Sequence, residues 1–90
     1  MLYMVIEHYK PGATKAIYER FAACGRMLPD GLEYVDSWVI PDGTLCYQLM
    51  HTDDPKIFEV WTANWNDLGD FEIIPVVSSK EMAERMKNKS

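Results

Sequence analysis

The sequence predicts one α+β domain whose elements follow the order β-α-β-β-α-β-α. Four short segments rich in β-branched and aromatic residues are typical of strands, and two longer segments place apolar residues at helical spacing. Turn and cap residues separate these segments, and no low-complexity tract interrupts them. Because 90 residues suffice for one domain, we expect a single domain over residues 1–90.

The first predicted strand and helix are both ended by breaker residues. Residues 2–9 are rich in Tyr, Val, Ile and Met, and the run Lys10-Pro11-Gly12 closes this strand. A helix is then expected over residues 14–24, because Ile17, Phe21 and Cys24 recur at helical spacing. Gly25 is the predicted C-terminal stop.

Residues 32–40 and 45–51 alternate around the turn Pro41-Asp42-Gly43-Thr44, which indicates a β-hairpin. Pairing of Ile40 with Leu45 fixes the register of the two strands. The cross-strand pairs that follow are Trp38 with Tyr47, Asp36 with Leu49, and Tyr34 with His51.

The second half of the chain predicts a helix, a strand and a further helix. Asp53-Asp54-Pro55 is a typical helix start, and Ile57, Phe58, Trp61, Trp65 and Leu68 supply the apolar stripe. Residues 71–77 form the fourth predicted strand. Because Pro75 has no backbone N–H to donate, we expect this strand at a sheet edge or with a bulge. Ser78 and Glu81 fit a capping box that opens a short C-terminal helix.

The first six elements fit a ferredoxin-like βαββαβ plait with an extra C-terminal helix. In this fold the antiparallel sheet has the strand order 4-1-3-2 and both helices cover one face. The other face is bare. We assign the smaller, more aliphatic residues to the helix side; these are Leu2, Met4, Ile6, Val35, Ser37, Val39, Cys46, Gln48 and Met50.

The residues assigned to the bare face include many rings. They are Tyr3, Val5, Glu7, Tyr9, Tyr34, Asp36, Trp38, Tyr47, Leu49, Glu72, Ile74 and Val76. Such a patch exceeds the few hundred Å² that soluble monomers usually expose. A second copy related by a two-fold axis is the simplest cover, so we expect a homodimer through the sheet face.

Three segments resemble the dimeric α+β barrel superfamily, and more narrowly a small bacterial family within it whose function is not established. They are MVIEHYKPG, GRMLPDGLEYVDSWV and CYQLMHTDDPKIFEVWTANWNDLGDFEIIPVV, which together cover most of the chain. The resemblance implies a homodimer with a cavity in each protomer, between sheet and helices or between sheet and partner. It implies no particular reaction, because fold alone does not fix chemistry.

The net charge of −5 argues against a nucleic-acid or anionic-membrane partner, since both require clustered Lys and Arg. Cys24 and Cys46 form no CxxC motif and are expected as reduced, mostly buried thiols. The N-terminal residues resemble neither a signal peptide nor a membrane span. These features favour a cytoplasmic protein.

The candidate site combines polar and aromatic residues of the predicted bare face. Glu7, Asp36 and His51 are the candidate catalytic groups, because a buried carboxylate beside a histidine can accept a proton from an organic acid or phenol. Tyr34, Trp38, Tyr47 and Glu72 are the candidate ligand contacts. The competing interpretation places the polar groups at strand ends in water or in hydrogen bonds across the dimer.

Other chemistries have weaker support in the sequence. His8 and His51 stand at strand ends without metal-binding spacing, so neither a metal nor a heme is expected. Trp61 and Trp65 lie one helical turn apart and are interpreted as core, with Gln48 as a partner for an indole N–H. Two functions remain open: a small-molecule-binding protein or cofactor-free enzyme acting on a partly aromatic compound, and a non-catalytic interaction module whose barrel is filled by its own side chains.

Overall fold

The computed structural model describes residues 1–88 and has the predicted order of elements. These are β1 (Leu2–Tyr9), α1 (Thr14–Cys24), β2 (Glu33–Val39), β3 (Leu45–His51), α2 (Ile57–Thr62), β4 (Gly69–Val76) and α3 (Ser79–Lys87). The four strands form one antiparallel sheet in the order β2-β3-β1-β4. The prediction of a ferredoxin-like plait with a C-terminal helix is therefore confirmed.

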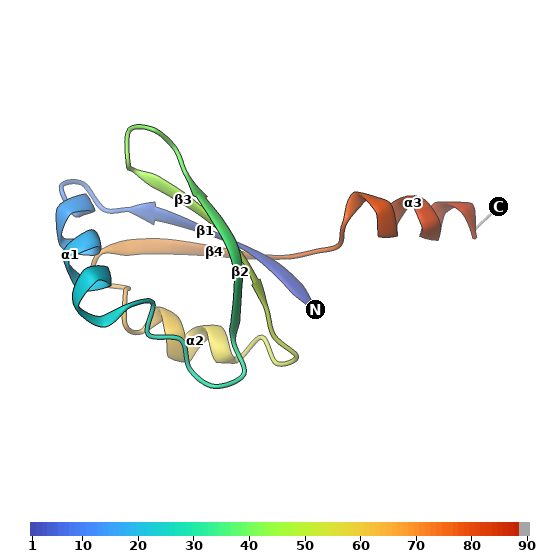
Figure 1. Ribbon diagram of the computed structural model, residues 1–90, viewed down its shortest axis with the longest axis horizontal. Helices are drawn as coiled ribbons and strands as arrows, with labels where there is room; N and C mark the ends of the chain where they lie inside the picture. Colours follow the sequence, from blue (N-terminus) through green and yellow to red (C-terminus); the bar gives the residue numbers. More distant parts are fainter. Residues whose placement is uncertain (89–90) are drawn as a thin grey trace.

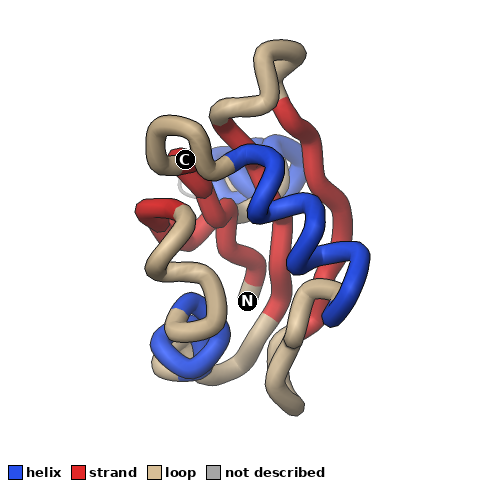
Figure 2. The backbone as a smooth tube through the Cα atoms, turned by 90° about the vertical axis from the view of Figure 1, so that its left-hand side faces the viewer, coloured by secondary structure: helices blue, strands red, loops and turns tan. Residues whose placement is uncertain are grey.

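Helices α1 and α2 lie on the same side of the sheet, and α3 stands apart beyond the end of β4 (Figure 1). Seen from the side, the strands twist relative to one another and α1 crosses in front of them (Figure 2). None of the helices in residues 1–88 has the length and hydrophobicity needed to cross a bilayer.

Local signals set the ends of the helices. Gly25 adopts a φ of 67° after α1, and its N–H donates to the carbonyl of Phe21. The carboxylate of Asp54 accepts a hydrogen bond from the N–H of Lys56 at 3.0 Å, which satisfies a free donor before α2. The hydroxyl of Ser78 accepts from the N–H of Glu81 at 3.0 Å, as predicted for the α3 cap.

The hairpin register is confirmed at two of the three predicted pairs, and a β-bulge changes the third. Trp38 pairs with Tyr47 and Asp36 with Leu49, but the register shifts between Tyr34 and Asp36. Tyr34 therefore pairs with Met50 and faces the helices. Its predicted place on the bare face was wrong, because the bulge inserts one extra residue and reverses the alternation beyond it.

The two faces of β1 are opposite to those predicted. Tyr3, Val5 and Glu7 are buried against the helices, and the intervening Leu2, Met4 and Ile6 face the other side. The reason is the register with β3. Tyr3 lies beside Met50, Val5 beside Gln48 and Glu7 beside Cys46, and direct partners share a face.

Aromatic rings dominate the core between sheet and helices. Trp61 and Phe58 are each 2% exposed, and Trp61 lies edge-on to Phe71 with ring centroids 5.5 Å apart. Phe58 lies edge-on to Tyr3 at 5.2 Å. This packing ties the short helix α2 to β1 and β4.

The bare face carries a contiguous set of apolar side chains from all four strands. Trp38 is 52% exposed and Ile74 45% exposed. We call this set the apolar sheet face; its members are Leu2, Met4, Ile6, Trp38, Tyr47, Leu49, Ile74 and Val76. The predictions for Trp38, Tyr47, Leu49, Glu72, Ile74 and Val76 are confirmed.

Helix α3 is the least buried element of the fold. Every residue of Ser79–Lys87 is exposed, and Met82 and Met86 lie one turn apart on it. The radius of gyration is 15.0 Å, compared with about 12 Å for a compact domain of this length. The excess reflects α3, which extends the longest axis of the molecule (Figure 1).

Candidate functional site

A cavity of about 200 Å³ lies between the sheet and the two helices. Five of its lining side chains are aromatic: Tyr9, Tyr18, Phe21, Trp61 and Trp65. Five others are polar or carry sulfur: Glu7, Arg26, Ser37, Cys46 and Gln48. The sheet pleat explains this grouping, because Ser37, Gln48, Cys46 and Glu7 all point to the helix side of their strands.

Glu7 is the buried acid of this cavity. Its side chain is 5% exposed, and Oε1 accepts a hydrogen bond from Nε2 of Gln48 at 3.4 Å. Oε2 is buried and has no hydrogen-bond partner within residues 1–88. Burial raises the pKa of the Glu7 carboxyl from 4.5 to about 7, because water no longer solvates the charged form.

Gly69 of β4 makes room for this carboxyl. A methyl group at Gly69 would stand 3.2 Å from Oε2 of Glu7 and 3.2 Å from the carbonyl oxygen of His8. Glycine is thus the residue that allows Glu7 to lie against the neighbouring strand.

Cys46 and Tyr9 continue the polar wall next to Glu7. Burial is the main cause of the raised pKa of the Cys46 thiol, and the charge of Glu7 adds to it. Burial also raises the pKa of the Tyr9 hydroxyl, with a hydrogen bond to Tyr18 as the next cause. Both groups are therefore neutral at physiological pH and act as hydrogen-bonding groups.

Arg26 supplies a positive charge at the other end of the cavity. Its guanidinium carbon lies 3.7 Å from the ring centroid of Tyr34 and 5.0 Å from that of Phe21. One guanidinium nitrogen donates to Oγ of Ser37 at 3.3 Å, and that oxygen lies 2.6 Å from the hydroxyl of Tyr34. Within residues 1–88, no carboxylate lies at ion-pair distance from Arg26.

The two indoles of the cavity share one acceptor. Nε1 of Trp61 and Nε1 of Trp65 both donate to the carbonyl oxygen of Arg26, at 2.9 and 3.1 Å. The prediction that Gln48 would accept an indole N–H was wrong, because both indoles donate to Arg26 and the Gln48 amide donates to Glu7. The shared acceptor fixes both rings as rigid walls.

Arg20 and Asp67 form a bidentate ion pair on the helix side of the sheet. Both terminal nitrogens of Arg20 donate to the Asp67 carboxylate at 2.8 Å. These hydrogen bonds lower the pKa of Asp67 from 3.8 to about 2. The pair joins α1 to the loop before β4.

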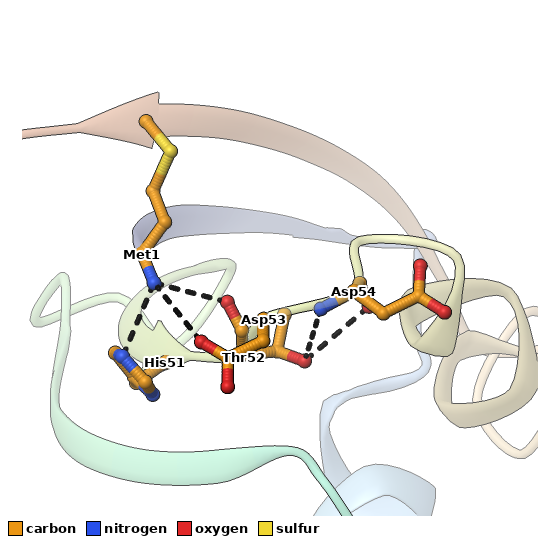
Figure 3. A network of polar contacts seen from close by, with 5 residues as sticks. All are labelled: Met1, His51, Thr52, Asp53 and Asp54. Carbon is orange, nitrogen blue, oxygen red and sulfur yellow. Dashed lines mark hydrogen bonds and ion pairs between the residues drawn. The ribbon is translucent and has the colours of Figure 1, made fainter.

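The other predicted polar residues lie at the edges of the bare face. Nε2 of His8 and Oε2 of Glu72 are 3.0 Å apart, and both side chains are more than half exposed. At the opposite end of the sheet, Nε2 of His51 lies 3.1 Å from the backbone nitrogen of Met1 (Figure 3). The same nitrogen donates to the carbonyl of Thr52 and lies 3.9 Å from Asp53 (Figure 3).

The sheet therefore divides the predicted site between its two faces. Glu7 and Tyr34 lie on the helix side of the sheet, although both were predicted to lie on the bare face. Asp36, Trp38, Tyr47, His51 and Glu72 lie on the bare side. Glu7 is thus separated from Asp36 and His51, and the predicted carboxylate–histidine combination does not form within one chain.

Sequence reasoning missed the polar groups that accompany Glu7. Cys46 and Gln48 were assigned to the helix side, which is confirmed, but not to a site. Arg26 directly follows Gly25 at the end of the first helix and belongs to no recognisable sequence motif. The one available signal was the polar Gln48 and Ser37 on a face assigned to the core, because buried polar side chains need partners.

Within residues 1–88, no group of three or more His, Cys, Asp or Glu side chains is arranged to hold a metal ion. Cys24 and Cys46 are free thiols; Cys46 is buried as predicted, but Cys24 is exposed.

Fold and cavity together define a small α+β plait with an aromatic-walled cavity and a buried carboxyl group. The chain belongs to the family described as a domain of unknown function, DUF3303, whose profile matches residues 1–90. No curated protein and no solved structure matches the chain.

Proposed function

We propose that this protein is a homodimer that binds a small, partly aromatic organic ligand in the cavity between its sheet and helices. The observation that carries the proposal is a cavity of about 200 Å³ with aromatic walls and a buried carboxyl group. Ligand sites are typically apolar hollows with a few polar groups that fix orientation. Two free cysteines suit a reducing compartment, so the proposed location is the cytoplasm.

Glu7 is also the group best suited to cofactor-free acid–base chemistry. Its pKa of about 7 allows it to hold or release a proton near neutral pH. Proton transfer with a bound phenol or organic acid would need no cofactor, and none is proposed.

Tryptophan fluorescence tests the cavity directly. Of the three tryptophans, Trp61 and Trp65 line the cavity and Trp38 lies on the opposite face. In a Trp38→Phe background, we expect small aromatic compounds to quench the emission in a saturable manner. Cys46→Phe, which fills the cavity, should abolish saturation.

Leu49→Phe is the matched control, because it adds a ring to the same strand on the other face. It should leave quenching unchanged. Thermal unfolding of both variants checks that they remain folded, since overpacking commonly costs about 1–3 kcal/mol. Equal quenching in the two variants would show that ligands do not bind in the cavity.

The apolar sheet face supports the homodimer. Four strands of seven or eight residues span a face of roughly 500 Å². This already matches the largest apolar patch of a typical monomer, while a standard interface takes about 800 Å² from each partner. The exposed Met82 and Met86 of α3 offer further apolar area, so we propose that α3 packs on the partner.

Met4→Lys tests the homodimer, because Met4 lies on a central strand between Leu49 and Ile74. We expect the unmodified protein to sediment as a dimer at micromolar concentration. The variant should be monomeric there, with at least a hundredfold weaker association, since burying an unpaired charge is costly. Val60→Lys, on the exposed side of α2, should remain dimeric. A stable single chain of the unmodified protein at this concentration would contradict the dimer.

The exposed apolar sheet face also favours a second candidate, an interaction module without a ligand. Its interface would be filled by its own side chains, including Trp38 and Tyr47. Such a protein would dimerise but show no saturable quenching in the Trp38→Phe background. Contacts of Trp38, Tyr47 and Glu72 with a ligand on this face stay a prediction.

A further inference from the structure

The polar groups of the cavity stand at two ends, on different strands. Ser37 on the edge strand β2 lies beside Gln48 of β3, and Gln48 lies beside Val5 of β1, two residues from Glu7. Adjacent strands are about 4.8 Å apart, so the β2 end and the β1 end are separated by roughly 10 Å. A ligand that fills the cavity therefore meets different chemistry at each end.

The β2 end is suited to an anion. The guanidinium of Arg26 is held by the rings of Phe21 and Tyr34 and by its hydrogen bond to Ser37. A guanidinium has five N–H donors and binds carboxylates in a bidentate manner. Because no carboxylate of residues 1–88 pairs with Arg26, its charge is available to an anionic ligand.

The β1 end is suited to a neutral oxygen. Oε2 of Glu7 is buried without a partner and lies close against Gly69 of the neighbouring strand. A protonated carboxyl is a hydrogen-bond donor, and a buried donor without an acceptor is costly. A ligand hydroxyl at this end would satisfy the carboxyl in either protonation state, because a hydroxyl both donates and accepts.

The size of the cavity limits the ligand between these ends. A cavity of about 150 Å³ already accepts benzene, and this one measures about 200 Å³. The indoles of Trp61 and Trp65 are fixed by their shared hydrogen-bond acceptor and suit a flat ring.

We infer that the ligand is a single-ring aromatic acid whose anionic group lies at Arg26 and whose hydroxyl group, on the opposite side of the ring, lies at Glu7. This inference rests on the proposed ligand-binding function. It makes Arg26 and Glu7 the residues that determine specificity, with the aromatic walls supplying affinity for any flat ring.

Calorimetric titration with three probes tests the inference. Para-hydroxybenzoate carries both groups, benzoate lacks the hydroxyl, and para-cresol lacks the carboxylate. We expect para-hydroxybenzoate to bind at least tenfold more tightly than either of the others. The difference in affinity between para-hydroxybenzoate and para-cresol measures the contribution of Arg26. The difference between para-hydroxybenzoate and benzoate measures the contribution of Glu7.

Variants assign each advantage to its residue. Arg26→Gln should remove the advantage over para-cresol but keep that over benzoate, whereas Arg85→Gln on the exposed α3 should change neither. Glu7→Leu should remove the advantage over benzoate, and Glu7→Gln should retain it because the amide still donates. Glu59→Leu, an exposed carboxylate on α2, is the matched control.

The outcomes separate this inference from the function on which it rests. Binding of para-cresol as tight as that of para-hydroxybenzoate would overturn the inference while leaving a ligand-binding cavity. Absence of heat with all probes, together with absence of saturable quenching in the Trp38→Phe background, would overturn both.

Discussion

Replacing Trp61 by alanine is expected to lower the free energy of unfolding by about 3–5 kcal/mol. Trp61 is 2% exposed, contacts the rings of Phe58 and Phe71, and donates its indole N–H to Arg26. A 90-residue domain has a total stability of roughly 5–13 kcal/mol. The variant should therefore lose roughly a quarter or more of its stability in urea denaturation followed by circular dichroism.

The neighbouring residue provides the control for this change. Val60 is 56% exposed on the same helix, and Val60→Ala should alter the free energy of unfolding by less than about 0.5 kcal/mol. Trp61→Phe keeps a ring but loses the hydrogen bond, while Trp65 still satisfies the carbonyl of Arg26. It should cost less than Trp61→Ala. A cost for Trp61→Ala as small as that of Val60→Ala would show that α2 is not packed on the sheet as described.

The second large effect is a pH dependence of the unfolding free energy, which arises from ionisation of Glu7. The pKa of Glu7 is 4.5 as an ordinary carboxyl and about 7 in the fold. Below pH 4.5 both the folded and unfolded chains hold the proton, so Glu7 carries no ionisation penalty. Between these values the unfolded chain releases the proton first, and stability falls as pH rises. Above pH 7 the loss levels off at about 3 kcal/mol.

Glu7→Gln removes this titration. The difference in unfolding free energy between variant and unmodified protein should shift by about 2–3 kcal/mol in favour of the variant between pH 5 and pH 8. Glu59→Gln, at an exposed position on α2, is the matched control.

Other groups near the site do not obscure this measurement. Asp67 changes its protonation only below about pH 4, since its pKa falls from 3.8 to about 2. The thiol of Cys46 and the hydroxyl of Tyr9 have raised pKa values and stay neutral across the range. A pH-independent difference between Glu7→Gln and the unmodified protein would show that Glu7 is solvated.

Element order, most of the hairpin register and the caps at Gly25 and Ser78 could be predicted from the sequence, because local signals encode them. Gly25, Asp54 and Ser78 each act within three or four residues of their position. The alternation of β3 was also informative, since it places Cys46, Gln48 and Met50 on one face and Tyr47 and Leu49 on the other.

The faces of β1 could not be predicted by the same reasoning. Leu2, Met4 and Ile6 are as apolar as Tyr3 and Val5, so composition does not distinguish the two sides of this central strand. Only the register with β3 decides which set meets the helices, and register is a long-range property. The bulge at Val35 is likewise invisible to a strict two-residue alternation. Both errors affected the site, because they moved Glu7 and Tyr34 to the wrong face.

The alternation along β1 has a consequence for how this chain can change during evolution. Odd-numbered positions of the strand face the helices, where Glu7 and Tyr9 line the cavity, and Leu2, Met4 and Ile6 belong to the apolar sheet face. A point substitution therefore alters one surface and leaves the other intact. Loss or gain of a single residue in mid-strand would exchange the two surfaces beyond that point, placing Glu7 outside and an aliphatic side chain against Gln48. This strand should thus accumulate replacements in related sequences while keeping its length constant.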